Sequence, residues 1–174
     1  MAAASQVPYV PVEVYLRSSY EPDAEYVDGV IEERPVGEWS HGDWQAAIVE
    51  FFRSRRKEWG IRAAGEVRVQ VRSNRFRIPD VTVVDRSFPA EQIITRPPIA
   101  VFEILSPEDY AKRLITRLND YEQMGIQTIL VLDPDGGKHF HFRNGALQPL
   151  TETAFDLPGS KCRFDLAEIE KLLD

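Results

Sequence analysis

The sequence contains little that would place it among disulfide-rich or membrane-spanning proteins. It has one cysteine, Cys162, in 174 residues, and a single cysteine excludes an intrachain disulfide framework. No stretch approaches the roughly 18 apolar residues that a membrane span needs. The opening residues 1–7 lack both a basic region and a long apolar run, so we expect no secretory signal. The expected protein is soluble and cytoplasmic, with no membrane partner.

A basic excess is also lacking. The chain carries 21 Lys and Arg against 28 Asp and Glu, a net charge of −7. Proteins that hold nucleic acid by neutralising phosphates usually present a basic surface, so any such contact here must come from local clusters. Two are present, one over residues 53–57 and one made of the four arginines between Arg68 and Arg77. The alternative, solvated faces that balance nearby acids, stays open because charge alone does not decide.

The hydrophobic content is sufficient for a packed core. Hydrophobic residues make up 43% of the chain and aromatic residues 10%, which excludes general disorder. A chain of this length fits one domain over residues 1–174. Residues 1–12 contain Pro8 and Pro11 and little periodicity, so we expect an arm or a loose tail there.

Apolar periodicity and turn signals predict an α/β fold in which helices cover a mixed sheet. A hairpin over residues 24–34 should turn at Asp28-Gly29, and a helix capped by Ser40 and Asp43 should end at Gly60. The other expected strands cover residues 65–72, 77–85, 99–106, 127–133 and, as an edge strand, 138–143. The other expected helices cover residues 12–19, a segment that begins at Ser106–Asp109 and ends near Gly125, and residues 164–173.

Two of these predicted strands each bring an acid into, or to the edge of, apolar surroundings. Asp80 follows Pro79 at a strand entrance, and Glu103 is the one polar residue between Ile99 and Leu105. An ionised carboxylate there is costly unless it is paired or bound to a metal. On neighbouring strands, opposed Cβ atoms lie about 4.5–5.5 Å apart, which leaves room for a cation with oxygen ligands at about 2.0–2.1 Å. A structural ion pair with an arginine is the alternative for Glu103.

The order of these motifs resembles the PD-(D/E)XK nuclease superfamily, and more closely its bacterial restriction-endonuclease-like branch. The segments that carry the resemblance, from Glu13 to the end of the chain, are Glu25–Gly29, Ser40-His41, Pro79-Asp80, Glu103–Pro107, Tyr121–Gly125 and Asp133-Pro134. The resemblance implies a restriction-endonuclease-like core, with a mixed β-sheet flanked by helices and an N-terminal β-hairpin extension.

The same resemblance implies an activity. The chain would be a metal-dependent endonuclease that hydrolyses DNA phosphodiester bonds, acting as a homodimer. Asp80 and Glu103 would bind Mg²⁺ or Mn²⁺, and such an ion lowers the pKa of bound water and neutralises charge on phosphoryl oxygens. Glu25 would be a further acid at the site, although a solvent-facing strand residue fits it equally well.

One position departs from the superfamily pattern, which places a lysine two residues after the glutamate, where this chain has Leu105. In the bacterial branch the basic residue lies on the following helix, which corresponds to Arg117. Helical spacing places Arg117 on the sheet-facing side with Leu114 and Tyr121. Arginine keeps its charge and can clamp a phosphate, but it is a poor proton acceptor.

Other functions therefore stay open. A nuclease-fold protein with weakened or no catalysis could serve as a nucleic-acid or protein binding module. A glycoside hydrolase with two carboxylates is disfavoured because no aromatic platforms accompany these strands. We interpret His41 as a helix-start or packing residue, and a zinc site at His139 and His141 lacks a third ligand nearby in sequence.

Overall fold

The computed structural model describes residues 8–34, 37–106 and 111–174. The helices are α1 (Val12–Arg17), α2 (Trp39–Ser54), α3 (Arg56–Trp59), α4 (Ala111–Met124) and α5 (Leu166–Glu170). The strands are β1 (Ala24–Val27), β2 (Val30–Glu33), β3 (Ile61–Gly65), β4 (Val69–Arg72), β5 (Arg75–Arg77), β6 (Val81–Asp85), β7 (Ala100–Ile104), β8 (Thr128–Leu132), β9 (Phe140–Arg143), β10 (Ala146–Pro149), β11 (Ala154–Asp156) and β12 (Arg163–Asp165). None of the helices in this part of the chain is long and apolar enough to cross a membrane.

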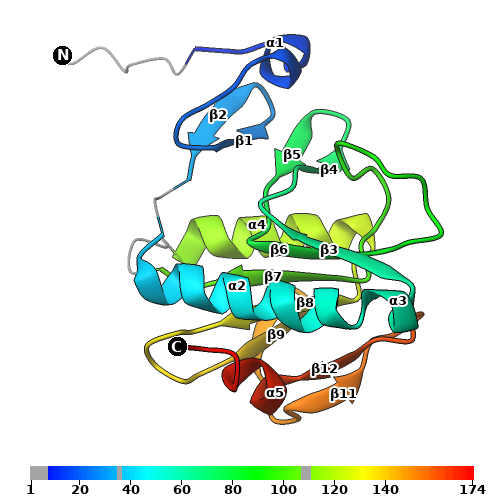
Figure 1. Ribbon diagram of the computed structural model, residues 1–174. Helices are drawn as coiled ribbons and strands as arrows, with labels where there is room; N and C mark the ends of the chain where they lie inside the picture. Colours follow the sequence, from blue (N-terminus) through cyan, green and yellow to red (C-terminus); the bar gives the residue numbers. More distant parts are fainter. Residues whose placement is uncertain (1–7, 35–36, 107–110) are drawn as a thin grey trace.

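A six-stranded sheet, in the order β10-β9-β8-β7-β6-β3, forms the centre of the molecule (Figure 1). Its inner strands β7 and β8 are buried along their whole length. They run parallel because α4 connects them as a crossover, whereas β6 pairs with β7 in the antiparallel direction. The predicted mixed sheet flanked by helices is therefore present.

Helices cover the two faces of this sheet, and the alternation along β7 decides what each face receives. Phe102 packs in the cluster that contains the apolar side of α2, whereas Val101 packs in the cluster that contains Leu118 and Tyr121 of α4. Because side chains alternate along a strand, Glu103 points to the same face as Val101. α4, the helix that follows β7 in sequence, thus covers the face on which Glu103 lies.

The predicted N-terminal hairpin is half of a second, four-stranded sheet, in the order β2-β1-β5-β4. Asp28 and Gly29 take positive φ values of 50° and 95° at its turn, as a two-residue hairpin connection with primed geometry requires. Tyr15 of α1, Tyr26 and Phe76 form a separate apolar cluster against this sheet. The small sheet therefore has a core of its own and is more than an extension of the large sheet.

The strand predicted over residues 65–72 is confirmed only for residues 69–72, because two sheets divide that segment. β3 belongs to the large sheet and β4 to the small one. Between them Glu66 takes a φ of 53°, a left-handed conformation that ends a strand. Val67, Val69 and Val71 do alternate with polar residues in the sequence, but a two-residue period does not indicate which sheet a segment joins.

Three further predictions need correction. α2 begins one residue before Ser40, with Glu38 as its N-cap and no side-chain capping bond, so the predicted cap is wrong. β9 is no edge strand, because the Asn144-Gly145 turn adds β10 beside it. The predicted C-terminal helix begins only at Leu166, after the unpredicted pair β11 and β12. The expected helix start at Ser106–Asp109 lies largely outside the described residues.

Candidate functional site

The pairing of β6 with β7 brings Asp80 and Glu103 together. Val81 is the antiparallel partner of Phe102, so Asp80, one residue before Val81, is level with Glu103, one residue after Phe102. The Asp80 Oδ2 atom accepts a hydrogen bond from the backbone N–H of Ile104 at 2.7 Å. Both acids have only 2% of their surface exposed. The structure thus places two carboxylates from segments distant in sequence at one point.

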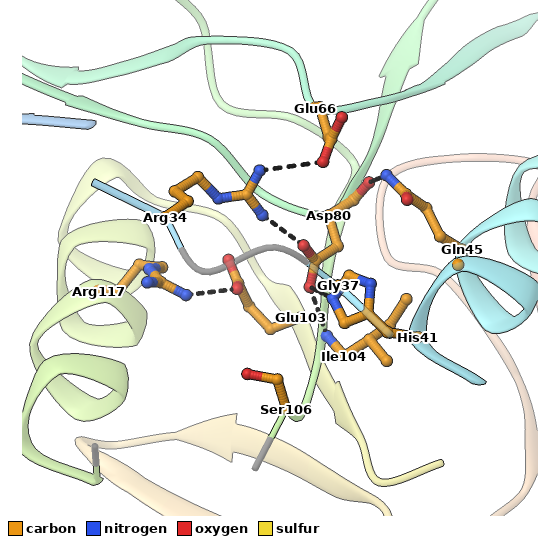
Figure 2. Close-up of a pocket in the computed structure, with 11 residues that line it drawn as sticks. Arg34, Gly37, His41, Gln45, Glu66, Asp80, Glu103, Ile104, Ser106 and Arg117 are labelled. Atoms are coloured by element: carbon orange, nitrogen blue, oxygen red, sulfur yellow. Dashed lines mark hydrogen bonds and ion pairs between the residues drawn. The ribbon is translucent and has the colours of Figure 1, made fainter. Parts of the chain in front are cut away.

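Both carboxylates line one cavity of about 170 Å³ (Figure 2). The polar side chains that line it with them are Arg34, His41, Gln45, Glu66, Ser106 and Arg117. Arg34 follows β2 of the small sheet, His41 and Gln45 lie in α2, and Arg117 lies in α4. The small sheet, both covering helices and the central strands therefore all contribute to this cavity.

Asp80 is held by two cationic groups and an amide. Arg34 Nη2 donates a hydrogen bond to Oδ1, His41 Nε2 lies 3.3 Å from Oδ2, and Gln45 donates to the backbone carbonyl at 2.9 Å. Burial opposes ionisation of Asp80, but His41 and Arg34 outweigh it, so the pKa of this carboxyl lies below its usual range. The hydrogen bond with Asp80 in turn raises the pKa of His41. Asp80 is therefore a carboxylate at neutral pH.

Glu103 has a different environment. The Tyr121 hydroxyl donates to its Oε1 at 2.6 Å, and Arg117 Nη1 donates to Oε2 at 2.8 Å. Burial raises the pKa of Glu103 to about 7, even though the Arg117 guanidinium works in the opposite direction. Two acids on adjacent strands thus have pKa values pushed in opposite directions, which is typical of functional sites.

The structure places Glu25 behind Arg117. Its side chain is only 1% exposed, so it is no solvent-facing strand residue. Its Oε2 accepts a hydrogen bond from Arg77 at 2.7 Å, and its Oε1 accepts one from the backbone N–H of Ile78 at 3.0 Å and lies 3.4 Å from Arg117 Nε. Glu25 is absent from the described residues that line the cavity. Glu25, which was expected as a further acid at the site, therefore lies behind Arg117 and not on the cavity wall.

Several cavity residues were not predicted from the sequence. His41 lies in the first turn of α2, as expected for a helix-start residue, but its ring also contacts Asp80. A signal was present: His41 and Gln45 continue toward the helix start the same stripe that buries Ile48 and Phe52. A polar start to an apolar stripe indicates a polar feature on the surface that the helix covers. Arg34 carried no comparable signal, because it follows the last residue of a half-buried hairpin strand.

Of the four arginines from Arg68 to Arg77, only Arg72 is exposed. Arg75 and Arg77 both contact Asp120 of α4 at 2.7 Å. The guanidinium of Arg68 lies over the Tyr15 ring, 4.8 Å from its centre. This cluster is therefore largely used inside the protein, and it leaves the arginines of the cavity as the cations closest to the two acids.

Only a small donor set is available for a metal ion. Over residues 8–34, 37–106 and 111–174, no group of three or more His, Cys, Asp or Glu side chains is arranged to hold one, and His141 instead contacts the backbone carbonyl of Gln127 at 3.3 Å. Asp80 and Glu103 remain as a pair of hard oxygen donors. Magnesium accepts one or two protein carboxylates and retains several waters, so this pair fits it.

One family model and one solved structure match most of this chain. The model of the Uma2 family, described as "Putative restriction endonuclease", matches residues 12–160. A solved structure described as "a putative nuclease belonging to DUF820", from Anabaena variabilis, is 22% identical, with a TM-score of 0.79 over 95% of this chain and 99% of its own. The fold class predicted from the sequence is thereby confirmed.

Two other results add no argument. A chain of a DrdV–DNA complex is 16% identical over 74% of this chain and 10% of its own, with a TM-score of 0.40. None of the curated proteins matches the sequence.

Proposed function

The chain belongs to the Uma2 family, and from this premise we propose that it is a nuclease that hydrolyses DNA phosphodiester bonds with the help of a divalent metal ion. The observation that supports the proposal is the cavity in which Asp80 and Glu103 lie level on adjacent strands, with Arg34 and Arg117 beside them. Paired acids and cations in one cavity match the needs of phosphoryl transfer, where charge must be stabilised on the phosphate oxygens.

Asp80 and Glu103 are the residues that would hold Mg²⁺ or Mn²⁺. A bound ion supplies an activated water and neutralises negative charge on the phosphate. The pKa of Glu103, raised by burial to about 7, supports this assignment. It means that Arg117 and Tyr121 together do not compensate the charge of the buried carboxylate, so a further cation beside it would be stabilising.

The other cavity residues would bind and orient. Arg34 and Arg117 keep their charge at any relevant pH and can form paired hydrogen bonds to a phosphate. Neither guanidinium accepts a proton readily, so we assign Arg117 to charge stabilisation. His41 and Gln45 hold Asp80 in place through its side chain and its backbone. Because the net charge of −7 repels DNA as a whole, these arginines would provide the local attraction.

A binding module without turnover is the second candidate. It is favoured by one observation, the arginine at position 117 where a lysine could exchange a proton. Both candidates bind DNA near the cavity, but only the nuclease cleaves it.

Incubation with supercoiled plasmid distinguishes these candidates. We expect nicking in Mg²⁺ and none in EDTA. Groups that only orient a metal ligand contribute about 10–100-fold, so we expect Asp80→Asn, which removes a ligand, to slow nicking by at least about 100-fold. Asp85→Asn, at the other end of β6, removes the same charge outside the cavity and should nick like the wild type.

Calorimetry with Mn²⁺ in the absence of DNA provides the second measurement. We expect heat of binding with the wild type and with Asp85→Asn, and none with Asp80→Asn. No heat with the wild type would contradict the metal site. Plasmid binding without nicking would identify the binding module, and nicking that persists in Asp80→Asn would reject this cavity as the active site.

A further inference from the structure

A chain of buried ion pairs runs from the small sheet to the cavity. Arg77 contacts Asp120 of α4 and Glu25 of β1, each at 2.7 Å. These three side chains are between 1% and 3% exposed. Glu25 faces Arg117, and Arg117 reaches Glu103 on the cavity wall at 2.8 Å. Positive and negative groups thus alternate from β5 to β7 at contact distances of 2.7 to 3.4 Å.

One link in this chain is longer than the others. Arg117 Nε lies 3.4 Å from Glu25 Oε1, beyond the usual 2.9–3.0 Å of an N–H···O hydrogen bond. This Nε atom is buried and has no hydrogen-bond partner among the residues that the structure describes. Arg117 is therefore bonded to Glu103 and has an unused Nε donor close to a second carboxylate.

The unused Nε donor of Arg117 becomes important when Glu103 binds a cation. A cation at Glu103 would compete with the Arg117 guanidinium for the same carboxylate. A buried guanidinium without a partner is strongly destabilising, and the Arg117 side chain is 12% exposed. Glu25 stands close enough that a shift of about half an ångström would give a hydrogen bond of normal length.

We propose that Glu25 is the alternate partner of Arg117, the carboxylate that takes up its guanidinium when Glu103 turns to a cation. Glu25 is then a positioning residue, which keeps Arg117 beside the cavity and leaves Glu103 available. This inference rests on the proposed cation site at Asp80 and Glu103. It assigns Glu25 a role other than that of a further acid on the cavity wall.

A comparison without metal tests the pairing. Glu103→Gln keeps the shape of the side chain and removes its charge, so Arg117 must then depend on Glu25. We expect Glu25→Gln to lower the melting temperature at least twice as much in the Glu103→Gln background as in the wild type. An equal decrease in both backgrounds would overturn the proposal.

The matched control is Asp120→Asn. Asp120 is buried, and it pairs with Arg77 as Glu25 does, but its hydrogen bonds go to Arg75 and Arg77 and none goes to Arg117. Its substitution should lower the melting temperature equally in both backgrounds. If Glu25→Gln does not fold, Glu25→Asp takes its place, because it keeps the charge beside Arg77 and withdraws the carboxylate from Arg117 by one methylene.

Mn²⁺ calorimetry in the absence of DNA tests the consequence for the cavity. Residues that orient a metal ligand contribute about 10–100-fold to affinity. We expect Glu25→Gln to weaken Mn²⁺ binding by about 10-fold or more and Asp120→Asn to weaken it much less. Equal weakening by both variants would mean a general charge effect and would overturn the role of Glu25.

The two proposals fail in different ways. If the wild type binds no Mn²⁺, the metal-dependent function and the coupling of Glu25 to it are both rejected. The melting comparison would then show whether Arg117 pairs with Glu25 on its own. If Mn²⁺ binds with equal affinity to the wild type and to Glu25→Gln, the cation site stands and the role of Glu25 is rejected.

Discussion

Glu103 is buried with fewer compensating charges than Asp80. Arg117 and Tyr121 each donate one hydrogen bond to it, but burial still raises its pKa from the ordinary 4.5 to about 7. Asp80, which contacts two cationic groups, keeps a pKa below its usual range. At the scale of the residue, the site therefore pairs one carboxylate that is charged at neutral pH with one whose pKa is about 7.

This difference predicts how stability depends on pH. Between pH values of about 4.5 and 7 the folded state holds a proton on Glu103 that the unfolded chain has lost, so the free energy of unfolding decreases as pH rises through this range. Glu103→Gln has no such proton to lose. From about pH 5 to pH 8, we expect the variant to gain roughly 1–3 kcal/mol relative to the wild type, measured by urea unfolding.

The control for this experiment is Glu152→Gln, which changes an exposed glutamate. Its unfolding curve should follow that of the wild type at both pH values. Parallel pH profiles for the wild type and Glu103→Gln would contradict the raised pKa of Glu103.

The two acids could be identified from the sequence because Glu103 stands alone in an apolar run and Asp80 stands at the entrance of another. Their cationic partners could not. Arg34 lies 46 positions from Asp80, and nothing around it differs from an ordinary strand end. A buried carboxylate leaves a local signature, whereas the group that neutralises it can come from any segment that the fold brings near. Arg117 was identified from the resemblance to the bacterial branch, and helical spacing supported its position on the sheet side of α4.

At the scale of the elements, Arg77 joins three of them. From β5 it contacts Glu25 in β1 and Asp120 in α4. The small sheet and the helix over the large sheet are thus connected through one guanidinium. Removal of one partner from a buried ion-pair network leaves charges without compensation, which is far more destabilising than loss of a surface pair.

We expect Arg77→Gln to lower the free energy of unfolding by about 3–5 kcal/mol, measured by urea unfolding. Arg163→Gln is the matched control, because its pair with Asp156 has side chains 52% and 84% exposed. Loss of such a pair changes stability by about 1 kcal/mol or less. Similar effects of the two substitutions would contradict a central role for Arg77.

The helices and strands also show where local sequence patterns were insufficient to predict the fold. The hairpin at Asp28-Gly29 was predicted correctly because its turn chemistry lies within two residues. The single strand predicted over residues 65–72 is divided because the change from one sheet to another occurs around Glu66, where the alternating pattern of the sequence continues without a break. Strand membership depends on long-range pairing, and period two contains no information about the partner.

At the scale of the whole molecule, the homodimer stays a prediction. Symmetric dimers are the commonest assemblies of soluble proteins, and two copies would provide one site for each strand of a duplex. We expect sedimentation equilibrium to give twice the chain mass of 19.9 kDa. A single species at the chain mass over a wide concentration range would exclude the dimer and would favour nicking over double-strand cleavage.

The order of the cavity residues along the chain has a consequence for biosynthesis. A nascent polypeptide that has been made as far as Leu105 already contains Asp80 and Glu103, but the guanidinium that reaches Glu103 comes from α4, and β8, which completes that side of the sheet, comes later still. To bury Glu103 at that stage would leave it without its cation. The cavity therefore takes its final form only after α4 and β8 have been made, late in translation.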